Sequence, residues 1–191
     1  MKKMPCLFVR QFHGRDHATL TEEVTPGCEW VLAGEGTASR KWDGTACMVR
    51  DGVLYKRLDC KRGKTPPPGA IPCQEPDPVT GHWPHWIKVD FTDPANRWFA
   101  EAYDDKGDTR LEDGTYELIG PKINGNPERV ERHTFRRHGD VLFDVPRTFT
   151  RIHLFLASFL IEGVVFAHPD GRMCKIRRDD YGLPWPVKET T

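Results

Sequence analysis

The sequence lacks an excess of either charge, a long hydrophobic run and a signal-peptide core. Its 28 lysines and arginines balance 28 aspartates and glutamates, so no global field attracts a polyanion or an anionic membrane. No stretch approaches the roughly 20 apolar residues of a membrane-spanning helix, and the basic N-terminus precedes only a short apolar run. We therefore expect a cytoplasmic protein with no membrane partner, in which any polyanion site is formed by local clustering of cations.

Paired cysteines are also missing, although the chain has six cysteines. No two of them have the two-residue separation of a thioredoxin-like motif or a zinc ribbon. Scattered reduced thiols are therefore the expected state. One looser arrangement leaves zinc open as an alternative, because a proline-rich segment contains two cysteines followed by two histidines: Cys60, Cys73, His82 and His85.

The size and composition are those of one globular domain. A chain of 191 residues can form one substantial core, so we expect a single domain over residues 1–191. The 17 glycines and 16 prolines predict many turns. The proline-rich stretch 61–90 predicts one long loop or a pair of loops. Its basic start, residues 61–64, could hold phosphates or form a solvated face.

The pair Asp51-Gly52 predicts a β-hairpin, because it separates two runs of strand-forming residues. Counting outward from this turn pairs Cys47 with Lys56. Provided that Gly44 does not twist the strand, side-chain alternation places Lys41, Asp43, Thr45 and Cys47 on the face shared by Lys56. Lys56 is then expected to be the nearer cation to Lys41.

A second hairpin is predicted at Asp170-Gly171. Counting outward from it sets Phe166 opposite Lys175 and places Glu162, Lys175 and Arg177 on one face. Such a group can be an exposed salt-bridged surface or a metal-binding carboxylate beside two phosphate-binding cations. The hairpin alone leaves both interpretations open.

Other local patterns predict simpler elements. Residues 29–33 have the composition of a strand. Residues 93–103 and 149–160 have the caps or the apolar spacing of helices. Glu117 is a lone carboxylate in the otherwise apolar strand 115–120, so it is either exposed at an edge or functional.

The run Lys41-Trp42-Asp43-Gly44 is an unusual start to a strand. A lysine nucleophile needs an electrophile close by, an unprotonated amine and a backbone slim enough to admit a phosphate. Lysine is normally protonated at neutral pH, and neighbouring cations favour its neutral form. A lone match to this pattern is more often a surface lysine beside a turn glycine, so the interpretation depends on the rest of the chain.

The order of these motifs resembles that of the covalent nucleotidyltransferases, which include ATP-dependent DNA and RNA ligases and mRNA capping enzymes. More closely, the chain from about residue 35 onward is similar to a small family of ATP-dependent 5′-to-3′ RNA ligases. The resemblance rests on Lys41-Trp42-Asp43-Gly44, Arg57-Leu58-Asp59, residues 71–89, residues 116–127, residues 162–165, Lys175-Ile176-Arg177 and residues 182–186.

The resemblance implies an α+β fold of the adenylyltransferase type, which is ATP-grasp-like. Antiparallel sheets with flanking helices would form two subdomains, without the C-terminal OB domain of larger ligases. It also implies ATP and Mg2+ or Mn2+ as cofactors. The expected partner is RNA with 5′-phosphate and 3′-hydroxyl ends, joined by a monomer.

The resemblance further implies roles for individual residues. Lys41 would attack the α-phosphate of ATP to form a lysyl-adenylate, whose AMP passes to an RNA 5′-phosphate before a 3′-hydroxyl displaces it. Lys175 would contact the α-phosphate, with Arg177 as the second cation of its motif. Glu117 would contact the ribose, and Glu162 would bind a divalent metal. Asp43 would orient the site or a metal-bound water, and Lys56 or Arg57 would contact a phosphate or the ribose. Phe143 is the candidate to stack on adenine, with a core position as the alternative.

Two departures and two rival functions remain. Arg40 stands where relatives often have an acid, and Arg177 stands where many ligases have lysine, so nucleotide contacts are open. GTP, or another nucleotidyl transfer with the same lysine chemistry, is one rival. The other is a non-catalytic RNA-binding module that uses the basic residues 129–138 and the proline-rich loop.

Overall fold

The computed structural model describes residues 3–14, 18–104 and 111–186. The chain divides into two compact units: unit 1 contains residues 1–3 and 43–137, and unit 2 contains residues 4–42 and 138–191. Most of unit 1 is therefore an insertion between the two parts of unit 2. That residues 1–191 act as one domain stays a prediction.

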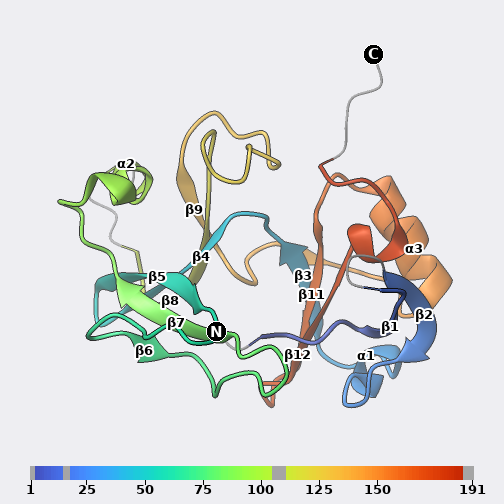
Figure 1. The fold of residues 1–191 in the computed structure, drawn as a ribbon. Coiled ribbons are helices and arrows are strands. Elements are labelled where there is room, and N and C mark those ends of the chain that lie inside the picture. Colours follow the sequence, from blue (N-terminus) through green and yellow to red (C-terminus); the bar gives the residue numbers. More distant parts are fainter. Residues whose placement is uncertain (1–2, 15–17, 105–110, 187–191) are drawn as a thin grey trace. The chain divides into compact units, whose positions relative to one another are not determined.

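Unit 1 is built on a six-stranded antiparallel sheet with the order β6-β7-β5-β4-β8-β9 (Figure 1). Its strands are β4 (Thr45–Arg50), β5 (Val53–Cys60), β6 (Ile71–Pro72), β7 (Trp83–Lys88), β8 (Gly114–Ile119) and β9 (Thr134–Arg137). The stretch 61–90 thus contains two paired strands as well as loops. Its proline-rich part is held to the sheet by backbone pairing.

The first predicted hairpin is confirmed. Asp51 and Gly52 have φ angles of 52° and 70°, the positive values that a two-residue hairpin turn needs to match the strand twist. Cys47 pairs with Lys56, as counting from the turn predicted.

A helix completes the core of unit 1. The Asp93 carboxylate accepts a hydrogen bond from the amide of Ala95, so a short 3-10 helix, η1 (Pro94–Asn96), starts here and leads into α2 (Arg97–Asp104). Helix α2 buries Phe99 and Ala102 in the apolar core that the sheet residues form. The helix predicted at 93–103 is therefore confirmed.

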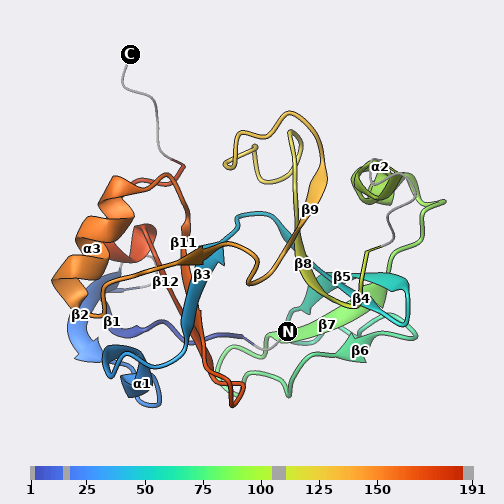
Figure 2. The same ribbon diagram turned by 180° about the vertical axis from the view of Figure 1, so that it is seen from behind.

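Unit 2 contains a four-stranded antiparallel sheet with the order β10-β3-β11-β12 (Figure 2). These strands are β3 (Thr37–Lys41), β10 (Leu142–Phe143), β11 (Gly163–Ala167) and β12 (Met173–Arg177). The other elements are a two-stranded sheet of β1 (Phe8–Phe12) and β2 (Ala18–Val24), and the helices α1 (Glu29–Leu32), α3 (Phe149–Ser158) and η2 (Asp179–Tyr181).

Strand alternation gives the four-stranded sheet one apolar and one polar face. Val164, Phe166 and Ile176 are completely buried and belong to a core that also contains Ile152 and Leu156 of α3. The alternate residues of β12, including Lys175 and Arg177, are only partly buried. Burial of the apolar face therefore fixes which way the basic residues of β12 point.

Three expectations from the sequence were wrong. Residues 29–32 form helix α1, which buries Trp30 and Val31, instead of a strand. The second hairpin is shifted by one residue, so Val165 pairs with Lys175. Residues 41 and 45 lie in separate strands of different sheets, so no continuous alternation connects Lys41 with Cys47.

The architecture confirms an α+β protein composed mostly of antiparallel sheets with few helices. None of the helices described is both long and apolar enough to cross a membrane.

Candidate functional site

Lys41 is the last residue of β3 and lies in a cross-strand row on the four-stranded sheet. It pairs with Gly163 of β11, which in turn pairs with Arg177 of β12. Because residues aligned across a sheet share a face, Lys41 and Arg177 point to the same side. Lys175, two residues before Arg177, returns to that side. Gly163 between them has no side chain, and a Cβ atom there would lie 2.3 Å from the carbonyl oxygen of Ile176, so β11 and β12 pack closely at this point.

Glu162 completes this group. Its side chain is 9% exposed and its carboxylate accepts a hydrogen bond from the Lys41 ammonium. The Lys41 side chain is 20% exposed, so the ion pair lies in a partly buried position where it is screened less than a surface pair. The structure thus brings together Lys41, Glu162, Lys175 and Arg177, which the sequence predicted to be functional, within unit 2.

Lys175 is the residue of this cluster whose charged form is disfavoured by its surroundings. Burial lowers the pKa of Lys175 from its usual 10.5, and the nearby charges of Lys41 and Arg177 lower it further, while Glu162 opposes them. Removing water from an ammonium and crowding it with other cations both disfavour its charged form. This is the electrostatic environment expected of a site that receives a polyanion.

We expect Lys175→Met to unfold at higher urea than the wild type at pH 7. A lysine whose pKa is lowered on folding binds fewer protons in the folded state, so its cost is fully present below the folded pKa and disappears as the pH rises past 10.5. The advantage of the variant is therefore expected to shrink between pH 7 and pH 10. Equal or lower stability of the variant at pH 7 would show that Lys175 carries no such cost.

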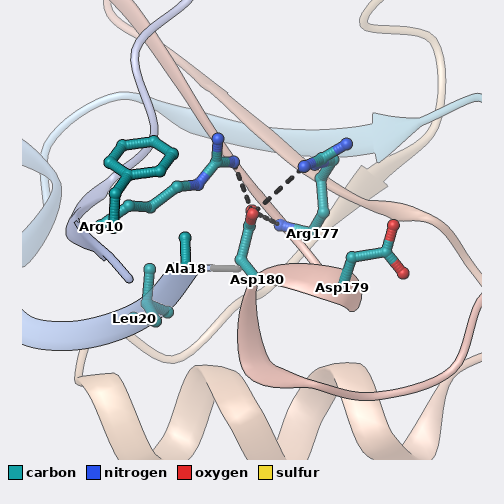
Figure 3. Close-up of a pocket in the computed structure, with 7 residues that line it drawn as sticks. Arg10, Ala18, Leu20, Arg177, Asp179 and Asp180 are labelled. Carbon is teal, nitrogen blue, oxygen red and sulfur yellow. Dashed lines mark hydrogen bonds and ion pairs between the residues drawn. The ribbon is translucent and has the colours of Figure 1, made fainter. Parts of the chain in front are cut away.

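Two residues that the sequence did not single out hold Arg177 in place. Arg10 of β1 donates to Asp180 at 2.5 Å, and Arg177 donates to the same carboxylate oxygen at 3.3 Å. Figure 3 shows both guanidinium groups directed at Asp180. The Asp180 side chain is 2% exposed and also accepts the backbone amide of Arg177 at 2.8 Å. Only the spacing of Arg177 and Asp180 could have been recognised in the sequence, since Arg10 is far away along the chain.

The same residues line a cavity of about 160 Å³ in unit 2. Its walls also include Ala18 and Leu20 of β2 (Figure 3). Because the carboxylates of Asp179 and Asp180 match the two arginines in charge, the lining of this cavity has no net positive charge.

Asp43 and Glu117 lie in unit 1, around the glycine that follows Asp43. The amide of Gly44 donates to Glu117 at 3.2 Å. The Asp43 carboxylate accepts from the side chain of Asn124 at 2.9 Å, and the Asp43 amide donates to Glu128 at 2.8 Å. These bonds fix the backbone immediately after Lys41-Trp42.

Gly44 is required by close packing. A Cβ atom here would lie 2.1 Å from the carbonyl oxygen of Leu118 and 3.0 Å from the side chains of Glu117 and Ile119. We expect Gly44→Ala to lower the free energy of unfolding by about 1–3 kcal/mol, as overpacking does. Urea denaturation measures this loss. An unchanged midpoint would mean that β4 and β8 can separate at no cost.

The remaining candidate residues have local partners. Lys56 donates to Asn96 at 2.5 Å, and Arg57 donates to Asp59 at 2.9 Å, both within unit 1. Phe143 of unit 2 makes edge contacts with Phe155 and Phe159. The structure therefore gives Phe143 neighbours in the core, and its contact with a base stays a prediction.

Metal ligands are sparse in the structure. Across the described ranges, no three histidine, cysteine or acidic side chains are grouped so that they could hold a metal ion. Of the four residues considered for zinc, His85 is 1% exposed and its ring bonds to the carbonyl of Trp83. A hard divalent cation needs fewer protein ligands, because Mg2+ usually combines one or two carboxylates with waters and substrate phosphates.

Comparison with known proteins identifies relatives of the chain. A family model described as RNA ligase 1 matches residues 108–191. RNA ligase 1 of Danio rerio is 28% identical over 273 positions, which cover 99% of this chain and 83% of that protein. RNA ligase 1 of Mus musculus is 35% identical over 94 residues, 43% of this chain and 28% of that protein. Over these residues the chain is similar to proteins named RNA ligase 1.

The predicted resemblance to RNA ligases is therefore confirmed. The RNA ligase 1 match at 108–191 contains Glu117, Glu162, Lys175 and Arg177, whereas Lys41 precedes it. The Rattus norvegicus RNA ligase 1, 29% identical over 144 residues, is covered over 44% of its length. The Danio rerio alignment has more positions than this chain has residues, so that RNA ligase 1 has segments without a counterpart here.

Proposed function

We propose that the protein is an ATP-dependent RNA ligase with a nucleotidyltransferase fold, which joins RNA 3′-hydroxyl and 5′-phosphate ends. The observation that carries this proposal is the cluster on one face of the four-stranded sheet. There Lys41 is bonded to the buried Glu162 and faces the same side as two further cations, Lys175 and Arg177. The relatives named RNA ligase 1 support the choice of RNA as substrate.

In the proposed first step Lys41 is the nucleophile. The ammonium must leave Glu162 and release one proton to solvent, because only the neutral amine has a free electron pair. A second proton passes from the nitrogen to solvent as the phosphoramidate forms. Its Nζ then forms a bond to the α-phosphorus of ATP as the bond from that phosphorus to the bridging oxygen breaks, and pyrophosphate leaves with the electron pair. Lys175 and Arg177 offset the negative charge of the phosphates during this transfer.

Two further transfers would complete the reaction. A 5′-phosphate oxygen of RNA attacks the phosphorus of the lysyl-adenylate, which returns Lys41 and forms an RNA adenylate. A 3′-hydroxyl then attacks the 5′-phosphorus, forms the phosphodiester and releases AMP. Each step exchanges one phosphorus–heteroatom bond for another, so ATP is the only energy source that is needed.

The residues present fit a divalent cation. Glu162 is a carboxylate with only 9% of its side chain exposed, and it loses one neighbouring positive charge when Lys41 loses its proton, a charge that a metal would replace. We assign Glu162 as a Mg2+ or Mn2+ ligand, with Asp43 as a second candidate. When bound, the ion would neutralise charge on the triphosphate.

Unit 1 supplies the other proposed nucleotide contacts. Glu117 is assigned to the ribose, and Lys56 or Arg57 to a phosphate or the ribose. The amide of Gly44 donates to one Glu117 oxygen at 3.2 Å, which fixes the position of this carboxylate beside Gly44.

Incubation of the full chain with α-labelled ATP, Mg2+ and a 5′-phosphorylated RNA tests the proposal. We expect label on the protein first, then on RNA, and finally a joined product without label from AMP. Labelling by GTP in preference to ATP would instead indicate a different nucleotidyl transfer. RNA binding without any labelled protein would indicate a non-catalytic module.

A further inference from the structure

A second cavity, of about 370 Å³, lies in unit 1 at the start of the proline-rich stretch. It is lined by the turn Lys61–Lys64 on one side and by residues between Pro76 and Trp83 on the other. The proposed ligase mechanism uses none of these residues. The cavity is therefore separate from the site of the proposed nucleotidyl transfer.

The turn brings two lysines together at the edge of the cavity. The amide of Lys64 donates to the carbonyl of Lys61 at 3.0 Å, and Gly63 has the positive φ of 77° that the third position of such a turn needs. A turn of this kind places its first and fourth Cα atoms within about 7 Å. Lys61 and Lys64 thus present two neighbouring positive charges from a defined backbone.

These charges have no acidic partner. Lys61, Arg62 and Lys64 are exposed, and none of the three forms an ion pair in the ranges that the structure describes. The one acid in the lining, Asp77, accepts the amides of Val79 and Thr80 at 3.0 Å and 2.9 Å.

Asp77 is further neutralised by Lys3, whose ammonium lies 3.3 Å from its carboxylate. Backbone bonds and this ion pair lower the pKa of Asp77 to about 2. It therefore stays ionised to hold its own loop, and the cavity keeps a net positive lining. This differs from the cavity at Asp180, whose lining contains two arginines and two aspartates.

Trp83 adds a fixed aromatic ring to the lining. Its indole nitrogen donates to the carbonyl of Gln74 at 2.8 Å, and its ring packs at 4.4 Å against the buried His85. The ring is thus held in place by contacts on its polar and inner sides. A positioned indole beside unpaired cations is the combination that binds single-stranded nucleic acid, because bases stack on the ring and phosphates meet the cations.

We infer that this cavity, with Lys61, Lys64 and Trp83 as its contacts, binds a single-stranded segment of the RNA substrate. The inference rests on the proposed ligase function for the identity of the strand. Lys61 and Lys64 contact backbone phosphates, and Trp83 stacks on a base. Arg62 packs over Gly81, where a Cβ would lie 2.9 Å from the Arg62 side chain, so it shapes the wall of the cavity as well as adding charge.

The test compares Lys61→Gln/Lys64→Gln with a charge-matched control, Lys88→Gln/Arg151→Gln, which removes two exposed cations outside the cavity. Binding of a fluorescent single-stranded oligoribonucleotide is measured without ATP over a series of salt concentrations. Each lost phosphate contact reduces the slope of log K against log salt by about 0.7. We expect the cavity variant to lose about 1.4 from the slope, and the control to keep the wild-type slope.

Trp83→Leu is expected to weaken RNA binding about 10-fold, because it removes the stacking of one base. The slope of log K against log salt is expected to stay that of the wild type. All three variants are expected to label with α-labelled ATP at the wild-type rate.

An unchanged slope in the cavity variant, or an equal change in the control, would overturn the inference. A raised KM for ATP in the cavity variant would also overturn it and assign the lysines to the triphosphate. Absence of labelling in the wild type would refute the ligase proposal instead, because RNA binding is measured independently of ATP.

Discussion

Lys41→Ala is expected to abolish transfer of label from α-labelled ATP to the protein, with a loss of at least about 1,000-fold in rate. The side-chain nitrogen is the only atom of Lys41 that can form a bond to phosphorus, and the alanine that replaces Lys41 has no nucleophilic group. Lys41→Arg is the matched variant, since it keeps a positive charge opposite Glu162 but offers a guanidinium that stays protonated. We expect Lys41→Arg to be as inactive as Lys41→Ala.

The chemistry of the adduct distinguishes Lys41 from other nucleophiles. A phosphoramidate formed by lysine is labile to acid and resists hydroxylamine at neutral pH, whereas an acyl phosphate on a carboxylate is cleaved by hydroxylamine at neutral pH. Label retained by either Lys41 variant, or cleaved by neutral hydroxylamine in the wild type, would refute the assignment. Urea denaturation of both variants shows whether any loss of labelling reflects unfolding.

Asp180→Ala is expected to cause the largest loss of stability, about 2–3 kcal/mol, because it leaves Arg10 and Arg177 without their common partner. The full cost of an unpaired buried charge is reduced here, since the two arginine side chains are 29% and 30% exposed. Urea denaturation measures the change. The control is Asp179→Ala, which removes the adjacent exposed carboxylate and is expected to change stability by less than about 0.5 kcal/mol.

Asp180 also has a positioning effect that a purely structural residue would not show. Because it fixes both the backbone and the guanidinium of Arg177, its loss is expected to raise the KM for ATP in the labelling reaction under conditions where the variant is folded. A variant with wild-type stability and wild-type KM would show that Arg177 is held by other contacts.

Local sequence patterns predicted those parts of the fold that depend on local chemistry. The register of the first hairpin follows from Asp51-Gly52, since both residues adopt the positive φ angles that a two-residue turn requires. The second hairpin has a similar Asp-Gly pair but a longer loop, closed by the amide of His168 on the carbonyl of Arg172. The Asp170 side chain bonds Arg172 inside this loop, and a count from the dipeptide cannot include such bonds.

The candidate site was predictable only where it depends on the alternation of side chains along a strand. The one-residue shift left Lys175 and Arg177 on a common face, because both strands alternate with period two. Glu162 lies just before β11, and its bond to Lys41 depends on the pairing of β3 with β11 across more than 120 residues of chain. The contact of Arg10 with Asp180 of η2 likewise comes from tertiary packing. No local pattern contains such contacts.

The strand order of unit 2 has an evolutionary consequence. Strand β3 ends at Lys41 and its neighbour β10 begins at Leu142, and Ser39 pairs with Leu142. The two chain crossings that bound residues 43–137 therefore start from adjacent strands, which is the geometry of a domain insertion. An insertion of this kind can gain or lose residues without changing the register that aligns Lys41 with Gly163. Changes of length within residues 43–137 are therefore compatible with an unchanged four-stranded sheet.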